Sequence, residues 1–214
     1  MFTTKLRLLV LALPAMALTA CATDDIVEDG GVVVNRSACP AVAIPAATGD
    51  VTLFDPPASR DARAIDVVAY LTNVRSQCGD SGDMIVTTAT YTVNARRRDA
   101  AGAREVILPT FTSMVQGGTG IVAKRTSRVA LRFADGQLLA TTTGGSTTQV
   151  SRAATTLPDT VRAKLTRRRK AGDVDAAVDP MTDPEVRTAV SRASFEMLVG
   201  FQLTPEQLAY NATR

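Results

Sequence analysis

Four aspartates in the last quarter of the chain have the residue type and spacing for carboxylate or calcium chemistry. They lie in the stretch DVDAAVDPMTD and are Asp173, Asp175, Asp179 and Asp183. A calcium-binding EF-hand loop needs Gly at its sixth position, and Val178 occupies that position if Asp173 is the first. Paired carboxylates acting as general acid and base would need a pocket, which the sequence does not locate. A solvated acidic loop is the favoured interpretation, and we predict no metal and no other cofactor.

The stretch CGDSGD, residues 78–83, resembles the nucleophile loop GDSGG of trypsin-like serine proteases. A serine nucleophile of that type needs a histidine base, and the chain contains no histidine. The same fact excludes Cys–His mechanisms and the usual zinc sites. We therefore interpret Ser81 as an ordinary hydroxyl in a turn between two strands, and we do not expect the protein to be an enzyme.

The chain has three cysteines, of which Cys21 follows an apolar run and two lie further along. With Cys21 used for an anchor, Cys39 and Cys78 remain as one pair in an oxidising compartment. A disulfide that closes a loop of about 40 residues stabilises a fold by roughly 4 kcal/mol on the chain-entropy model. The alternative is two free thiols. Because no CxxC motif is present, we do not expect a thioredoxin-like role.

Residues 1–20 have the three parts of an export signal, namely Lys5 and Arg7, the apolar run LLVLALPAMAL, and small residues before a cleavage site. The apolar run is shorter than the roughly 20 residues that a membrane-spanning helix requires. Leu18-Thr19-Ala20-Cys21 resembles the bacterial lipobox, so we predict that Cys21 carries lipid, including an acyl chain such as palmitate. The alternative is an ordinary cleaved signal with a chance cysteine.

Removal of residues 1–20 would also change the charge balance. The count of Lys and Arg falls from 24 to 22 once Lys5 and Arg7 are lost, against 21 Asp and Glu. A globally cationic surface is therefore not expected, and nucleic acid is not a predicted partner. Residues 21–37 are acidic and without periodicity, so we interpret them as a flexible tether.

Residues 38 to about 150 have the pattern of a strand-rich domain. Long segments rich in β-branched residues, such as MIVTTATYTVNARRR, are separated by short Gly, Asp and Asn turns. This pattern predicts a mainly β fold, an antiparallel immunoglobulin-like β-sandwich extending over residues 38–214. Asp135-Gly136, between VALRF and QLLATTT, is the strongest hairpin signal in the chain.

A short helical insertion is expected at about residues 157–192, before the last strand. Val161 and Leu165 have helical spacing, and Asp183 with Pro184 is typical of the start of a second helix. Residues 195–203 then alternate between apolar and other positions, as a strand on the core does. Residues 204–207, TPEQ, have the form of a capping box at the start of a final helical turn.

One dense run of cations stands at the end of the first predicted helix. Its members are Arg167, Arg168, Arg169 and Lys170. Near an anionic surface each such charge contributes roughly 1 kcal/mol to the binding free energy. The run is therefore a candidate contact for an anionic lipid, phosphate or acidic protein. The alternative is a solvated helix end neutralised by the neighbouring aspartates.

The run GFQLTPEQLAYN, together with LPTF, IVAKR and VALRFADG, resembles a family of uncharacterised exported lipoproteins of alphaproteobacteria. The resemblance implies a periplasm-facing domain on an outer-membrane lipid anchor, and Ala22 rather than Asp after the lipidated cysteine agrees with that membrane. It supplies no catalytic residues. We therefore expect a structural or protein-interaction role in the cell envelope, with the membrane and an envelope protein as partners. The alternative is a carboxylate-based enzyme or small-ligand carrier that uses the helical insertion.

The predicted anchor has a direct test. Substitution Cys21→Ser removes the thiol that takes the lipid, so the variant should leave the membrane fraction for the soluble fraction. Fractionation of cells followed by immunoblotting measures this shift. Retention of the variant in membranes would refute the lipid anchor.

Overall fold

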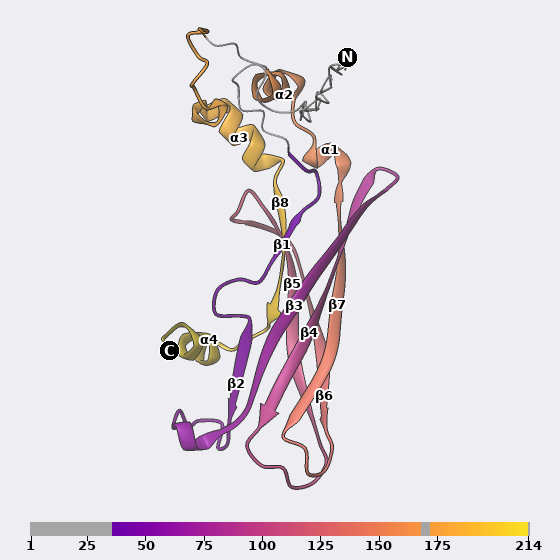
Figure 1. The fold of residues 1–214 in the computed structure, drawn as a ribbon, viewed down its shortest axis with the longest axis vertical. Helices are drawn as coiled ribbons and strands as arrows, with labels where there is room; N and C mark the ends of the chain where they lie inside the picture. The colour runs from indigo at the N-terminus through magenta and orange to yellow at the C-terminus, as the bar shows by residue number, and fades with distance from the viewer. Residues whose placement is uncertain (1–35, 168–171, 214) are drawn as a thin grey trace, which may run out of the picture.

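The computed structural model describes residues 36–167 and 172–213, which form a sandwich of two four-stranded sheets (Figure 1). Sheet A has the order β1-β8-β5-β6 and consists of β1 (Ala41–Ala43), β8 (Phe195–Phe201), β5 (Arg104–Gln116) and β6 (Gly120–Phe133). Sheet B has the order β2-β3-β4-β7 and consists of β2 (Asp50–Phe54), β3 (Ile65–Ser81), β4 (Met84–Arg97) and β7 (Leu139–Ser151). Neighbouring strands are antiparallel except β1 and β8, which are parallel. The prediction of a mainly β sandwich is confirmed.

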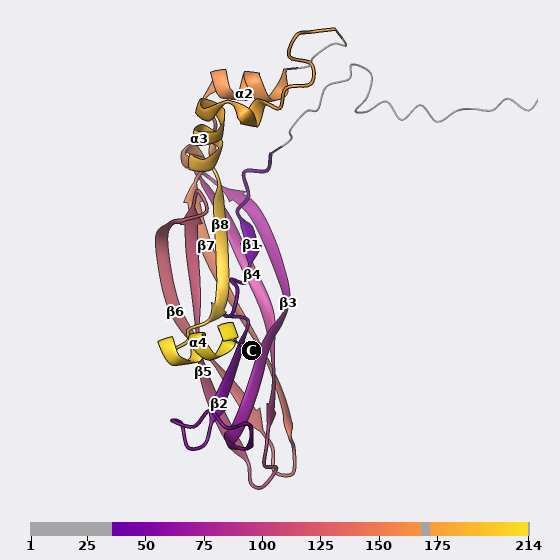
Figure 2. The same cartoon turned by 90° about the vertical axis from the view of Figure 1, so that its left-hand side faces the viewer.

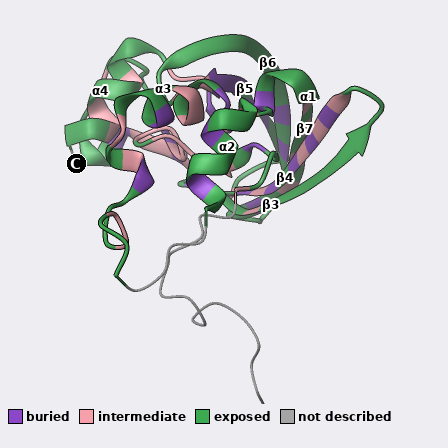
Figure 3. Cartoon of the chain, turned by 90° about the horizontal axis from the view of Figure 1, so that it is seen from above, coloured by how far each residue is buried: buried purple, intermediate pink, exposed green. Residues whose placement is uncertain are grey.

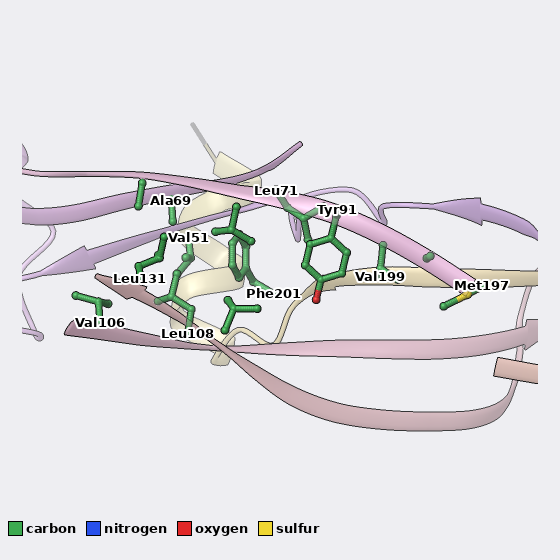
Figure 4. Packing of buried hydrophobic residues seen from close by; sticks show 14 of the residues in the cluster. Val51, Ala69, Leu71, Tyr91, Val106, Leu108, Leu131, Met197, Val199 and Phe201 are labelled. Atoms are coloured by element: carbon green, nitrogen blue, oxygen red, sulfur yellow. The ribbon is translucent and has the colours of Figure 1, made fainter. Parts of the chain in front are cut away.

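The core lies between the sheets and follows the two-residue period of the strands. Alternate residues of β4 are buried, from Ile85 to Arg97, while their neighbours are more exposed. The predicted inward face of β8 is buried at Phe195, Met197, Val199 and Phe201. Figure 4 shows Met197, Val199 and Phe201 facing Leu71 and Tyr91 of sheet B, and all of these residues belong to one core cluster. Full burial of one large apolar side chain stabilises a fold by about 1.5–3 kcal/mol, so this layer holds the sheets together.

The helical segments gather mostly at one end of the sandwich (Figure 2). They are η1 (Ala62–Ala64), α1 (Arg152–Thr155), α2 (Asp159–Thr166), η2 (Pro180–Thr182), α3 (Pro184–Arg192) and α4 (Pro205–Thr213). The predicted insertion before the last strand is confirmed, and α2, η2 and α3 bury their own small cluster around Val161, Leu165 and Val186. Asp183 caps α3 by accepting from the amide of Glu185 at 2.8 Å. No helix in the described part of the chain is long and apolar enough to cross a membrane.

Helix α4 closes the outer edge of sheet B. The predicted capping box is present, because Gln207 Oε1 accepts from the amide of Thr204 at 2.9 Å and Thr204 Oγ1 accepts from the amide of Gln207 at 3.3 Å. Asn211 Nδ2 donates to the carbonyl of Asp50, at the start of β2, at 2.8 Å. The amide of Asn211 therefore occupies a backbone acceptor of the edge strand β2.

The turn at Asp135-Gly136 exists, with Gly136 in the left-handed region at φ 73°, but the hairpin predicted there is wrong. Strands β6 and β7, on its two sides, belong to different sheets and do not pair. Residues 134–138 instead carry the chain across the sandwich from sheet A to sheet B. A turn signal specifies a reversal of the backbone, but it does not specify whether the returning strand pairs with the previous one or packs against it.

The first described residues are tied to the helical end of the domain. Arg36 donates to Ser194 Oγ at 2.9 Å and also to the carbonyl of Ala193. Burial lowers the pKa of the Arg36 guanidinium below its usual value. Cys39 and Cys78 form the predicted disulfide, with their Cα atoms 6.1 Å apart. Ordered contacts of the domain thus begin inside the segment 21–37 that we interpreted as a tether.

The outer half of β3 extends past its neighbour β2, which pairs only with the first residues of β3, from Ile65 to Tyr70. A register shift between Thr72 and Arg75, with Asn73 at a φ of 52°, twists the strand at this point. Residues 75–81 are all exposed, as Figure 3 shows from above. The disulfide at Cys78 fastens this exposed arm to the chain that leads into β1.

The opposite end of the sandwich is organised by a buried arginine. Arg97, at the end of β4, is only 2% exposed. Its guanidinium makes four hydrogen bonds of 2.7–2.9 Å, and the acceptors are the backbone carbonyls of Ala100, Gly102, Ala134 and Gln137. It also lies 5.3 Å from the centre of the Phe133 ring. One side chain therefore joins the β4–β5 loop to the crossing from β6 to β7.

We expect Arg97→Met to lower the free energy of unfolding by about 3 kcal/mol, because four carbonyls lose a charged donor. The matched control is Arg96→Met, since Arg96 is the exposed neighbour on the same strand. The control should change stability by less than about 0.5 kcal/mol. Urea unfolding followed by circular dichroism measures both values, and equal effects of the two substitutions would contradict the organising role of Arg97.

Candidate functional site

Strands β6 and β7 present two long unpaired edges on the same side of the sandwich (Figures 1 and 2). Among residues 36–167 and 172–213 each pairs with one neighbour only, β6 with β5 and β7 with β4. The edges on the opposite side of the two sheets are protected at β1, β2 and the outer half of β3, because β1 and β2 have only three and five residues, β2 is met by Asn211, and the outer half of β3 is bulged and disulfide-bonded. Long strand edges with free backbone donors and acceptors are where proteins add a strand.

The two edges border an opening between the sheets. Near the crossing, Val129, Leu131 and Phe133 of β6 are buried, so the sandwich is closed there. Every residue of β6 from 120 to 128 is exposed. In a closed sandwich alternate residues would be buried. The exposure of both faces of this half of β6 therefore means that sheet B does not cover it.

Two cavities fill this opening, and we call them together the seam groove. The lower cavity has a volume of about 540 Å³, and its walls include Tyr91, Ser127, Arg128, Arg132, Gly144 and Gly145. The upper cavity has a volume of about 270 Å³, and its walls include Met114, Lys124, Arg125, Thr148, Val150 and Phe195. Both cavities take their walls from β6 on one side and β7 on the other.

Hydroxyl groups line much of the seam groove. Thr110 Oγ1 and Ser127 Oγ are hydrogen-bonded at 2.8 Å across β5 and β6. On the facing sheet, Thr87 and Thr148 are partners in register on β4 and β7. The hydroxyls of this second pair are buried, and neither has a hydrogen-bond partner among the residues that the structure describes. The inner wall therefore carries hydrogen-bonding capacity in a region that a simple sandwich fills with apolar side chains.

The groove is cationic on one wall and uncharged on the other. Strand β6 carries four cations and no acidic residue, and these are Lys124, Arg125, Arg128 and Arg132. Arg132 pairs with Glu105 at 2.8 Å, and Lys124 lies 5.2 Å from the centre of the Phe111 ring. Within the described ranges, Lys124, Arg125 and Arg128 form no ion pair. Strand β7 has no charged side chain. The site thus has a net positive charge that the fold leaves uncompensated.

Tyr91 forms part of the groove floor, and its ring restricts which residue can occupy the paired position on β7. Its ring projects from sheet B toward sheet A (Figure 4). Gly144, its partner in register on β7, lies under the ring, and a Cβ atom there would come closer than 3.0 Å to three atoms of Tyr91. Gly145 follows directly. A glycine inside a strand often marks a close approach by another group, and here the ring of Tyr91 makes that approach to Gly144.

The residues singled out from the sequence lie away from this groove. Cys21, Arg168, Arg169 and Lys170 fall outside the described residues. Arg167 is described, and it forms an ion pair with Asp175, as the solvated-helix alternative expects. Ser81 ends β3, pairs in register with Met84 and so lies in the predicted turn.

Asp175, Asp179 and Asp183 of the helical insertion line one pocket of about 280 Å³, but their carboxylates interact with other groups of the insertion. Lys164 Nζ lies 2.9 Å from both Asp183 and Glu185. This cation lowers the pKa of Asp183, which is the opposite of what a general acid requires. Asp179 caps η2 by accepting from an amide. In residues 36–167 and 172–213 no group of three or more Asp, Glu, Cys or His side chains is placed to hold a metal ion.

Sequence reasoning missed the seam groove because β6 and β7 were interpreted as one hairpin. Two signals were present. Residues 124–128, KRTSR, place polar or charged side chains on both faces of a strand, which a strand over a closed core does not tolerate. The segment TTTGGSTTQ in β7 has hydroxyls and one glycine, Gly144, on its inner face where apolar residues are the rule.

The chain matches no protein-family model, no curated protein and no solved structure. The resemblance to exported alphaproteobacterial lipoproteins therefore stays a prediction, and the properties of the site rest on its own geometry.

The free energy of unfolding of a Gly144 variant tests the contact between Tyr91 and Gly144. Gly144→Ala should lower the free energy of unfolding by about 1–3 kcal/mol, because the methyl group meets the ring. The control is Gly79→Ala on β3, where a Cβ atom would have no neighbour within 4 Å and where stability should stay the same or rise by up to about 1 kcal/mol. Chemical denaturation measures both. A double variant with Tyr91→Ala should recover part of the loss, and strictly additive effects would contradict the contact.

Proposed function

We propose that the protein is a periplasm-facing lipoprotein of the outer membrane whose sandwich binds another protein of the cell envelope. The export signal and the motif LTAC in the sequence support the anchor on Cys21. The binding site is the seam groove. In this proposal the domain has an interaction or structural role and performs no chemistry on its partner.

The observation that carries the proposal is the pair of long, unpaired and exposed strand edges that border one groove. Natural sandwiches protect edges of this length because exposed edges join other chains. This fold protects β1, β2 and the outer half of β3 with short strands, a helix, a bulge and a disulfide, while β6 and β7 have 14 and 13 residues. Selective protection of this kind favours the seam groove as a binding surface.

The carboxylate-based alternative has less support. Its acidic residues cap helices or pair with Lys164 and Arg167, so their charges already stabilise the insertion. The candidate anionic contact at residues 167–170 stays a prediction, and only Arg167 of that run is described. Neither feature combines free hydrogen-bonding groups, open volume and uncompensated charge as the seam groove does.

Site-directed photocrosslinking in intact cells tests the proposal. The photoreactive amino acid benzoylphenylalanine replaces Ala123 in the upper cavity or Ala130 in the lower one, and Tyr70 on the outer face of sheet B as a matched exposed control. We expect a discrete protein adduct from the two groove positions and none from the control position. Mass spectrometry identifies the adduct, and the purified partner should then bind the purified chain.

Two results would contradict the proposal. One is equal adduct formation at the control position, which would mean unspecific contact. The other is the lack of any protein adduct at both groove positions while the protein is present in membranes at normal abundance.

A further inference from the structure

We infer that the seam groove takes an extended, acidic segment of another protein, which adds as a strand to the free edge of β6. This inference rests on the proposed function and specifies the chemistry of the partner. Four features of the groove support it: the length of the free edge, the distribution of charge on β6, the glycines of β7 and the mismatch between two copies of the chain.

The free edge of β6 is long enough to bind an extended peptide. The fully exposed part of β6 covers residues 120–128. At about 3.3 Å for each residue, this stretch offers roughly 30 Å of unpaired backbone. Backbone hydrogen bonds along such an edge supply affinity without regard to sequence, and the side chains of alternate residues supply specificity.

The cations of β6 lie on both faces of this strand, so they would lie beside both faces of a strand added to its edge. Arg125 is the register partner of Thr112, whose side chain faces the core, so Arg125 lies on the groove side of β6. Lys124 and Arg128 stand four positions apart on the opposite, outer face of β6, where they border the upper and lower cavities from the strand edge. Opposite charges directly across a strand pair stabilise it by roughly 0.2–1 kcal/mol. The preferred segment therefore has acidic residues opposite Lys124 and Arg128, and one acidic residue opposite Arg125.

The facing wall requires small or moderately apolar side chains on the groove side of the segment. Gly144 and Gly145 add no side chain to the wall of the lower cavity, where the ring of Tyr91 forms the floor. Met114 and Phe195 contribute apolar surface to the upper cavity. Valine, threonine and alanine match this mixture of apolar surface and hydroxyls, and valine and threonine also favour the extended conformation.

A second copy of the same chain does not match the edge. Two β6 strands placed side by side would bring Lys124, Arg125 and Arg128 against the same cations of the other copy, and like charges across a strand pair are destabilising. The uncharged β7 edge offers no compensating acid. Charge complementarity therefore selects an acidic partner.

Binding of synthetic peptides to the full chain in detergent tests the inference. Three fluorescent peptides of about ten residues, the length that fits the free edge, are compared by anisotropy. One alternates valine with aspartate and has one further aspartate in place of its central valine, to face Arg125. The second has lysine in place of every aspartate, and the third repeats the first with N-methyl groups on alternate backbone amides. We expect the acidic peptide to bind, and the lysine and N-methylated peptides to bind at least tenfold more weakly, because each loses the charge match or the backbone donors.

The charge variants form a matched pair. Arg125→Glu with Arg128→Glu should weaken binding of the acidic peptide by about tenfold or more. Arg75→Glu with Arg96→Glu changes the net charge equally at exposed positions of sheet B, and it should leave binding within about twofold. Circular dichroism confirms that both variants are folded.

Four results would overturn the inference. Equal binding of the N-methylated peptide, or of polygalacturonate as an anionic glycan, would show plain charge attraction without strand addition. No measurable binding of the acidic peptide would also overturn it. Binding only after neutralisation of Asp24, Asp25, Glu28 and Asp29 would make the chain's own acidic segment the occupant. A groove photoadduct obtained together with any of these results would leave the proposed function standing.

Discussion

The guanidinium of Arg97 holds the point where the chain crosses from one sheet to the other, and the arrangement of the sandwich depends on that crossing. The carbonyls that it binds belong to the β4–β5 loop and to residues 134–138. A charged group inside a fold must find several acceptors at once, which restricts these loops to one geometry. The crossing held in this way leads into β7 of the second sheet, so β6 keeps an open edge. The same buried charge therefore closes one end of the sandwich and leaves its side open.

The open side is a consequence of sheet topology, and the side chains along it are adapted to it. A strand of a sandwich normally presents one apolar face to the core, whereas residues 120–128 of β6 include polar residues on both faces. On β7, a glycine lies under the ring of Tyr91, so the aromatic side chain fills space that a side chain from its own register partner would otherwise occupy. Volume, hydroxyls and charge are thus concentrated along one seam, while apolar packing is concentrated in the centre and near the crossing.

Local patterns in the sequence predicted local structure well. The alternation in β8, the N-cap at Asp183 and the capping box at Thr204 each depend on contacts between residues a few positions apart, and each is present. The disulfide followed from the number of cysteines. The hairpin predicted at Asp135-Gly136 is wrong because strand pairing is a long-range property, and the contacts at this turn include residues far apart in sequence, such as Arg97 and Ala134. The seam groove was missed for the same reason, since its walls come together only through that long-range choice.

The tie between Cys39 and Cys78 has a mechanical consequence. Strand β1 consists of three residues in parallel register with β8, which is a weak support against tension along the chain. Cys39 lies just before β1, and its covalent bond leads to β3, a strand whose inner part is paired on both sides within sheet B. A pull on the amino-terminal side of the domain is therefore carried past β1 into sheet B. Tension then spreads over the long β3–β4 ladder instead of peeling sheet A open from its shortest strand.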